Sequence, residues 1–388
     1  MIEADDRIFP LDVLRGAAIL GVVVMNVAAI ALPFPASVSP WGGQNGLGDA
    51  LVWLVEFILV DGKARGLLAM LFGASALLVI DRAEMDGRDG LAAQRRRLYW
   101  LLPIGLAHHL LFWSGDILLL LAIAGLISLR FVGHEPLDLV KAAFLFFGVQ
   151  LLIVGVTAAM IYVGASAPAY AELLHREVVH DMAVHRGGYG EQLLWRIMEF
   201  PKALGLLAFY ALPETLGFMA LGMAMAKGGF FMGQWSAEQY RQTAQRAYLV
   251  GIPPMLALGL WAMLSGDART ADVVAFGASF PLRIPLTIGH AALLVMVAGG
   301  TSSLTRHVAA VGRMALSNYL LATLILTSLA YGYGLDLYAS LDRAALLVVA
   351  VVLGAGMIFW SPPWLARFGR GPAERLWHRL QRIGARAG

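Results

Sequence analysis

Long apolar runs separated by short polar segments are the dominant pattern along this chain. Crossing the ~30 Å hydrocarbon core of a bilayer takes about 20 helical residues, and several runs approach or exceed that length. The pattern predicts spans at residues 13–33, 50–80, 98–114, 116–133, 140–164, 203–226, 247–265, 274–300, 308–330 and 343–361. The runs are continuous and not alternating, which argues against a transmembrane β-barrel. We therefore expect an all-α polytopic membrane protein, with about ten helices in one bundle over residues 1–388.

Three segments depart from this regular pattern. Gly62 and Lys63 interrupt the run at 50–80, which is too long for one straight crossing, so we expect a kink or a short re-entrant piece. The polar segment 165–202 predicts a partly helical outer loop. The arginine-rich segment 364–388 predicts an amphipathic helix that lies on an anionic membrane leaflet.

Composition and charge agree with a membrane protein and suggest its orientation. The chain is 59% hydrophobic and 14% charged, and it has no cysteine, which excludes disulfides and thiolate chemistry. With the N-terminus inside, the cytoplasmic segments hold nineteen of the 29 basic residues and the outer segments hold six. The positive-inside rule then predicts cytoplasmic termini, and it accounts for the basic pI of 9.2 without nucleic-acid binding.

Five blocks of sequence recur in the order typical of a known family and extend over nearly the whole chain. They are Pro10-Leu-Asp12-Val-Leu-Arg15-Gly16, Lys63 with Leu71-Phe72-Gly73, Gly105-Leu-Ala-His108 with Phe112-Trp113-Ser-Gly115-Asp116, Gly312-Arg313-Met-Ala-Leu-Ser-Asn318-Tyr319, and Gly371-Pro372-Ala-Glu374-Arg-Leu-Trp377. In these blocks the chain resembles the YeiB-like family of bacterial inner-membrane proteins, a domain of unknown function numbered 418. The resemblance implies a multi-pass protein of the bacterial inner membrane.

The family is in turn similar to a superfamily of transmembrane acyltransferases, which includes heparan-α-glucosaminide N-acetyltransferases and bacterial polysaccharide O-acyltransferases. In the O-acyltransferases a catalytic His follows the first-span Arg-Gly by eleven residues. Asn26 occupies that position here, as in the glucosaminide branch, which places its His in the outer segment after the first span. This chain has no His between Asn26 and Lys63, so acyl transfer would need another base, and His108 is the leading candidate.

The segment between the third and fourth predicted spans carries the strongest candidate site. His108 lies six residues before Ser114, about 9 Å inside the outer end of its span, and His109 points about 100° away. His108 is predicted either as a general base or as a hydrogen-bonded link between helices. Asp116 either orients an imidazole or binds an acceptor hydroxyl, although capping of the next helix would also explain it.

Charged residues within other spans are predicted to bind substrate. Lys63 is deep in its span, where pairing with a carboxylate or binding of an anion is expected. Arg283, between two prolines, indicates a broken helix that lines a cavity. The candidate carboxylate partners of Lys63 are Glu56, Asp61 and Glu214. If the second and third spans are neighbours, Lys63, His108 and Asp116 should line one polar cavity in the outer half of the bundle.

A second polar group begins at the inner end of the first span. Asp12 and Arg15 share one helix face, where they form either a local ion pair or an anchor for a phosphorylated donor such as acyl-CoA. Asn26 is ~16 Å further along the same helix. Asn318, beside Tyr319, is a further polar residue within a span. The candidates for substrate binding in this group are Asp12, Arg15, Asn26 and Asn318.

These observations leave three functions open. The first is a membrane acyltransferase that uses cytoplasmic acyl-CoA as co-substrate, with an acceptor from the membrane or periplasm. The alternative is a transporter or flippase for a small anionic or lipid-linked compound, and the third is a scaffold without turnover. The sequence has no nucleotide-binding or metal-binding motif, and we expect no tightly bound cofactor. The expected partners are the lipid bilayer and a small-molecule or lipid-linked substrate, and a homodimer is left open.

Overall fold

The computed structural model describes residues 8–41, 46–300 and 302–383, and in these ranges the chain is helical, with no β-strand. The α-helices are α1 (Phe9–Ala31), α2 (Phe34–Val38), α3 (Leu47–Leu59), α4 (Lys63–Met85), α5 (Gly90–Leu111), α6 (Leu118–Ser128), α7 (Pro136–Gly164), α8 (Ala167–His185), α9 (Tyr189–Leu206), α10 (Leu212–Lys227), α11 (Ala237–Leu264), α12 (Ala268–Asp272), α13 (Phe280–Ala298), α14 (Ser303–Arg313), α15 (Ala315–Ala330), α16 (Arg343–Phe368) and α17 (Pro372–Ile383). Short 3₁₀ turns cover Leu129–Phe131 and Phe230–Met232, and π-helical segments cover Leu207–Ala211 and Val273–Ala278.

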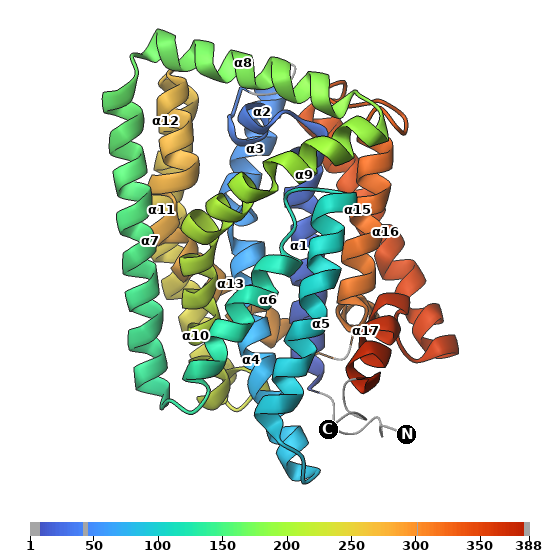
Figure 1. The fold of residues 1–388 in the computed structure, drawn as a ribbon. Coiled ribbons are helices and arrows are strands. Elements are labelled where there is room, and N and C mark those ends of the chain that lie inside the picture. The colour runs from blue at the N-terminus through green and yellow to red at the C-terminus, as the bar shows by residue number, and fades with distance from the viewer. Residues whose placement is uncertain (1–7, 42–45, 301, 384–388) are drawn as a thin grey trace.

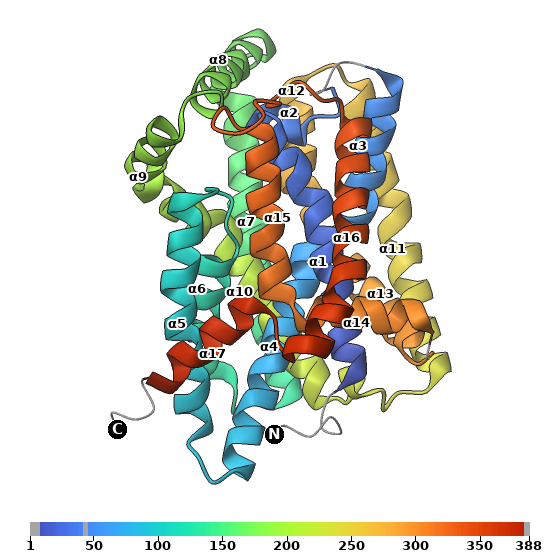
Figure 2. The same cartoon turned by 90° about the vertical axis from the view of Figure 1, so that its right-hand side faces the viewer.

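The long helices form one bundle whose two ends differ (Figure 1). Helix α8 lies across the end that is uppermost in Figure 1, which we call the upper end. At the opposite, lower end, α1 begins, α4 and α5 meet in a hairpin, and α17 lies against the bundle (Figure 2). The start of α1 and the last helix therefore lie on the same side.

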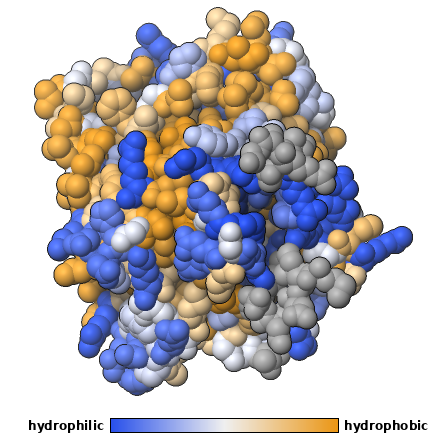
Figure 3. All heavy atoms as spheres, turned by 60° about the horizontal axis from the view of Figure 1, so that its bottom comes forward, coloured by the Kyte–Doolittle hydropathy of each residue, from blue (hydrophilic) through white to orange (hydrophobic). Residues whose placement is uncertain are grey.

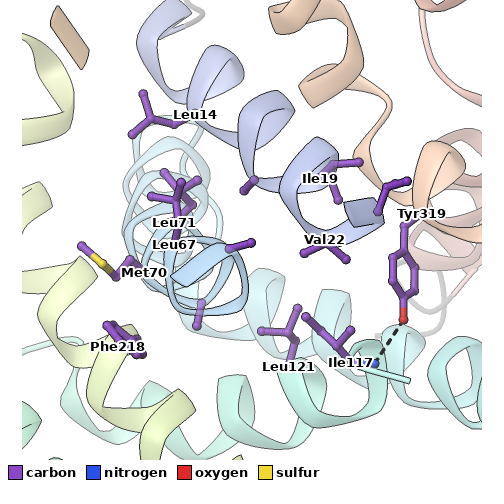
Figure 4. Packing of buried hydrophobic residues seen from close by; sticks show 14 of the residues in the cluster. Leu14, Ile19, Val22, Leu67, Met70, Leu71, Ile117, Leu121, Phe218 and Tyr319 are labelled. Atoms are coloured by element: carbon purple, nitrogen blue, oxygen red, sulfur yellow. Dashed lines mark hydrogen bonds between the residues drawn. The ribbon is translucent and has the colours of Figure 1, made fainter. Parts of the chain in front are cut away.

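Helix α1 is at the centre of the bundle because it is apolar on almost every face. It packs against α4, α13, α14, α15 and α16. Leu14, Ile19 and Val22 of α1 belong to the same buried core as Leu67 and Leu71 of α4, part of which Figure 4 shows. An all-round apolar helix is typical of a buried element, whereas α7, at the edge, buries only 17% of its most apolar stretch.

Seven helices of the described residues are long and apolar enough to cross a membrane, or eight if α14 and α15 count as one bent span. The expected count of ten is therefore not confirmed by length and composition. The two predicted spans without a counterpart among these helices are 98–114 and 116–133. The first corresponds to α5, which begins at Gly90 and carries three consecutive arginines, and the second to α6, which has only 11 residues.

The interruptions in the helices are only partly where the sequence indicated. The run at 50–80 is broken at Gly62, whose φ of 74° ends α3 and allows α4 to begin at Lys63. The break expected around Arg283 is wrong in position. Helix α13 continues through Pro285, and Pro281 is in its first turn, where a missing N–H costs nothing. The irregular segment is the π-helical stretch Val273–Ala278 just before it.

The segment predicted as an outer loop, 165–202, forms α8 and most of α9 and is tied to the bundle by Arg196. This arginine is 2% exposed. Its guanidinium donates to the carbonyl oxygens of Leu110 at 2.8 Å and Leu111 at 3.3 Å. These carbonyls are at the C-terminus of α5, where no intrahelical N–H is available. Arg196 therefore caps α5 from a different helix.

The amphipathic helix expected in 364–388 begins later than that segment, and residues 384–388 lie outside the described residues. Residues up to Phe368 continue α16, and α17 begins at Pro372. The inner face of α17 is not free to lie on lipid, because Glu374 accepts hydrogen bonds from the backbone N–H groups of Leu316 and Ser317. Helix α17 thus caps the N-terminus of α15.

Candidate functional site

His108 and Asp116 form a buried pair at the top of the α5–α6 hairpin. His108 Nδ1 lies 2.7 Å from Asp116 Oδ1, and the two side chains are 2% and 0% exposed. With Asp116 ionised, Nδ1 carries the proton and donates it, so Nε2 is the basic nitrogen. His108 Nε2 is buried and has no hydrogen-bond partner among the described residues. The pair therefore offers one unoccupied basic nitrogen.

Local sequence explains how the two side chains meet. Helix α5 ends at Leu111, and α6 begins at Leu118, so the chain reverses between them. Asp116 uses its second oxygen, Oδ2, to accept from the N–H of Leu119 at 2.7 Å, which caps α6. The sequence left two roles open for Asp116, capping of the next helix and orientation of the imidazole. In the structure Asp116 has both.

Gly105 allows the two helices of the hairpin to approach closely. A Cβ at this position would lie 2.8 Å from Leu119 Cα and closer still to its backbone nitrogen. Such distances are below any ordinary contact, so a larger residue would move α6 away from α5. Gly105 is one turn before His108, and its absence of a side chain therefore helps to set the distance between His108 and Asp116.

Tyr319 of α15 completes the site. Its hydroxyl lies 3.4 Å from Asp116 Oδ1 and accepts from the N–H of Ile117 at 3.3 Å, the contact drawn in Figure 4. The centroid of its ring is 5.1 Å from the centroid of the His108 ring. Because Asp116 thus holds both the imidazole and the phenol, three helices fix one compact polar group inside apolar surroundings.

A cavity of about 850 Å³ leads from the lower end of the bundle to Tyr319. Small-molecule and cofactor sites typically measure ~300–1,000 Å³. Its charged lining residues are Arg15, Arg82, Arg88, Arg97, Arg313, Asp12, Asp81 and Glu374. Further along the same helices the lining becomes apolar, with Ile19, Leu71, Leu121 and Ile117 before Tyr319. Hydrophilic side chains predominate at this end of the molecule, as Figure 3 shows, with hydrophobic ones between them.

The charged part of the cavity is held together by contacts between distant segments. Arg15 pairs with Asp12 at 3.1 Å and donates to Ser75 of α4. The Arg97 guanidinium lies 4.7 Å from the ring of Trp377 in α17. Burial raises the pKa of the Glu374 carboxyl above its usual value, while its hydrogen bonds act in the opposite direction. Five arginines against three carboxylates give this wall a positive balance suited to phosphate groups.

The structure does not place all predicted site residues together. Asp12 and Arg15 line the cavity, and His108 and Asp116 form a pair that the lining residue Tyr319 contacts. Lys63 is not among the residues that line this cavity, and a single cavity for Lys63, His108 and Asp116 stays a prediction. As the first residue of α4, Lys63 turns to the carbonyl of Phe57 in α3.

The other predicted residues lie apart from the cavity. Glu214 and Arg283 form a separate cluster with Lys63 in the bundle interior, and Asn26 is buried on α1. Asn318 is fully buried, and its amide makes three hydrogen bonds, to Val311, Ser361 and Trp360. Its role in the structure is to connect helices, because its polar atoms are already used.

Several lining residues were not recognised from sequence as site residues. From the sequence alone, Tyr319 is only a polar neighbour of Asn318, and the arginines between residues 82 and 97 indicate orientation. Trp377 and Glu374 come from the C-terminal helix, far along the chain. Among the described residues no group of three or more His, Cys, Asp or Glu side chains could hold a metal ion.

Fold and site together define an all-helical membrane protein with a polar cavity at one end and a buried His–Asp pair beyond it. Residues 225–384 match the family described as a protein of unknown function, DUF418. The chain is 34% identical to the uncharacterized protein YeiB of Escherichia coli K12, over 97% of this chain and 96% of that protein. It is 26% identical to the uncharacterized protein YxaH of Bacillus subtilis, over 96% and 94% of the two chains. The chain therefore belongs to the YeiB-like DUF418 family. No solved structure matches it.

Gly105→Ala tests the close approach of α5 and α6. The added methyl overpacks the hairpin, so we expect a loss of about 1–3 kcal/mol in stability, seen as a lower melting temperature of purified protein. Gly155→Ala in α7 is the control, since a Cβ added there would meet no atom of another helix within 4 Å and alanine favours a helix. Equal melting temperatures for Gly105→Ala and the control would show that the hairpin has room for a side chain.

Proposed function

We propose that this protein is an acyltransferase of the bacterial inner membrane and a member of the transmembrane acyltransferase superfamily. It transfers an acyl group from cytoplasmic acyl-CoA to a hydroxyl or amine of an acceptor that arrives from the membrane or the periplasm. One observation carries the proposal: Tyr319 both lines the cavity at the lower end and contacts the His108–Asp116 pair. A donor in the cavity would thus end beside a basic nitrogen.

The proposal includes ten crossings with both termini in the cytoplasm. Eight crossings follow from the long apolar helices with α14 and α15 as one bent span, and α5 and α6 supply two more. An even number agrees with α1 beginning at the end where α17 lies (Figure 2). The lower end carries the arginines of the α4–α5 hairpin, so the positive-inside rule makes it cytoplasmic.

The cavity suits the two chemical halves of an acyl-CoA. Arginine groups such as Arg15, Arg88 and Arg97 can bind phosphate oxygens near the cytoplasmic mouth. The apolar wall that follows suits the acyl chain and directs it towards Tyr319. Acyl-CoA is a substrate in this scheme, and no resident cofactor is required.

His108 is the proposed general base. Its Nε2 removes the proton of the acceptor hydroxyl or amine as the acceptor attacks the thioester carbonyl. The new C–O or C–N bond forms, the C–S bond breaks, and the CoA thiolate leaves with a proton returned from the imidazole. Asp116 stabilises the imidazolium in between, as carboxylates do in other His-dependent acyl transfers.

Orientation is tested by cysteine labelling, to which the chain is suited because it has no cysteine of its own. Ser166 precedes α8 at the upper end, and Ser236 precedes α11 at the lower end; both are exposed. In whole cells, Ser166→Cys should react with an impermeant maleimide and Ser236→Cys should be shielded. The reverse pattern would invert the proposed orientation.

His108→Gln tests the general base. Glutamine can keep a hydrogen bond to Asp116, so folding should be retained while turnover falls on the order of 10² to 10⁴-fold. His109→Gln is the control, because His109 packs against Phe200 and not against Asp116. The assay follows radiolabelled acetyl-CoA or a longer acyl-CoA with purified protein and a bacterial lipid and glycan extract. If no label is transferred and CoA gives no thermal protection, acyl transfer is rejected and transport becomes the leading function.

Arg15→Ala tests the donor cavity. Loss of a phosphate-binding guanidinium should raise the KM for acyl-CoA with a smaller effect on kcat, since Arg15 is remote from His108. Arg306→Ala is the matched control, because Arg306 is exposed on α14 near the same end and does not line the cavity. An unchanged KM in Arg15→Ala would remove Arg15 from the donor site.

A further inference from the structure

Three interruptions of helices come together around one group of charges in the bundle interior. The break at Gly62 precedes Lys63 and Arg65, and the two π-helical segments precede Glu214 and Arg283. Irregular backbone within a membrane bundle is tolerated where it lies inside protein or lines a polar space. Discontinuous helices often carry the residues that bind ions or substrates. We call Lys63, Arg65, Glu214 and Arg283 the break cluster.

Glu214 is the carboxylate of the break cluster, and it has two cationic neighbours. Arg65 of α4 forms an ion pair with Glu214 Oε2. Arg283 Nη1 is 3.7 Å from Glu214 Oε1, too long for a good hydrogen bond. Glu214 Oε1 and Arg283 Nε are both buried and have no hydrogen-bond partner among the described residues. The ion pairs therefore leave hydrogen-bonding capacity unused.

Lys63 is the least compensated charge of the cluster. Its side chain is 1% exposed, and its ammonium donates to the carbonyl of Phe57 and lies 5.4 Å from the Phe57 ring centroid. Within the described residues no carboxylate comes within 4 Å of this ammonium, Asp61 included. A buried ammonium whose direct contacts are a carbonyl and an aromatic ring, with no carboxylate in contact, is costly in hydrocarbon.

The break cluster contains more positive than negative charges. With Lys63 protonated, the cluster has three positive charges, on Lys63, Arg65 and Arg283, against Glu214, and an excess of one remains even if Asp61 is included. The side chain of Arg65 is 27% exposed, so the cluster is not sealed on that side. Gly62 supports the arrangement, because a Cβ there would lie 2.6 Å from Arg283 Cδ. The backbone break thus lets the arginine approach Lys63.

We propose that the break cluster is a second binding site, which takes an anionic oxygen group, phosphoryl or carboxyl, between Lys63 and Arg283. The anion accepts from the Lys63 ammonium and the unused Arg283 Nε and neutralises the excess charge. Either a lipid headgroup or a free small anion could supply these oxygens. The site is separate from the His108 cavity, and its existence does not depend on acyl transfer.

The test measures melting temperature of the full-length protein in nanodiscs of phosphatidylcholine. One arm adds inorganic phosphate or acetate to these discs, and the other replaces part of the lipid by phosphatidylglycerol. The variant is Lys63→Gln, which keeps a donor for the Phe57 carbonyl. The control is Lys141→Gln, which removes an exposed lysine paired with Asp138 on α7.

A wild-type melting temperature that rises with the logarithm of anion concentration supports the site. Lys63→Gln should weaken the apparent affinity at least about tenfold, and Lys141→Gln should leave it unchanged. A rise with phosphatidylglycerol alone identifies a lipid headgroup, and a rise with phosphate or acetate alone identifies a free anion. No rise in the wild type, or an equal rise in Lys63→Gln, overturns the proposal. If Lys63→Gln does not fold, native mass spectrometry of the wild type decides, because absence of a retained phosphate or phosphatidylglycerol adduct also overturns it.

Discussion

A bilayer offers no water to polar groups, so every charge inside the bundle must find its partner within the protein. This constraint organises the molecule. Arg343, 2% exposed at the start of α16, donates to three carbonyls in residues 36–39 and so fixes the segment after α1. Arg196 does the same for the carbonyl end of α5. Buried arginines thus act here as caps that connect helix ends to loops from distant parts of the chain.

Against this background, the buried polar groups that lack partners are informative, since such groups are rare in folded proteins. Among the described residues they include Nε2 of His108, both ring nitrogens of His109, and atoms of Glu214 and Arg283. Some of these atoms lie at the end of α5 or in the break cluster, and others, on Asp49, Gln94, Gln150, Tyr333 and Arg343, lie elsewhere in the bundle. Two of them carry a further sign of ligand binding: His108 belongs to the pair that Tyr319 contacts beside the cavity, and Arg283 belongs to the break cluster with its excess of positive charge.

The sequence predicted the helical architecture and the proximity of His108 and Asp116, because long apolar runs and an eight-residue separation are local properties. It could not predict which face of a helix meets which neighbour. Lys63 and His108 were expected in one cavity, but the break at Gly62 turns Lys63 towards α3. The role of Tyr319 was equally inaccessible, since its contact with Asp116 joins residues 203 positions apart.

Helix α17 shows why the candidate site depends on the whole chain. Trp377 donates to the carbonyl of Arg97 at 3.0 Å, which fixes the lower part of α5, the helix that carries His108. Glu374 caps the N-terminus of α15, the helix that carries Tyr319. The same two side chains line the cavity. A single short helix at the lower end of the bundle therefore contributes both to the shape of the cavity and to the relative positions of the two helices whose residues meet at Asp116.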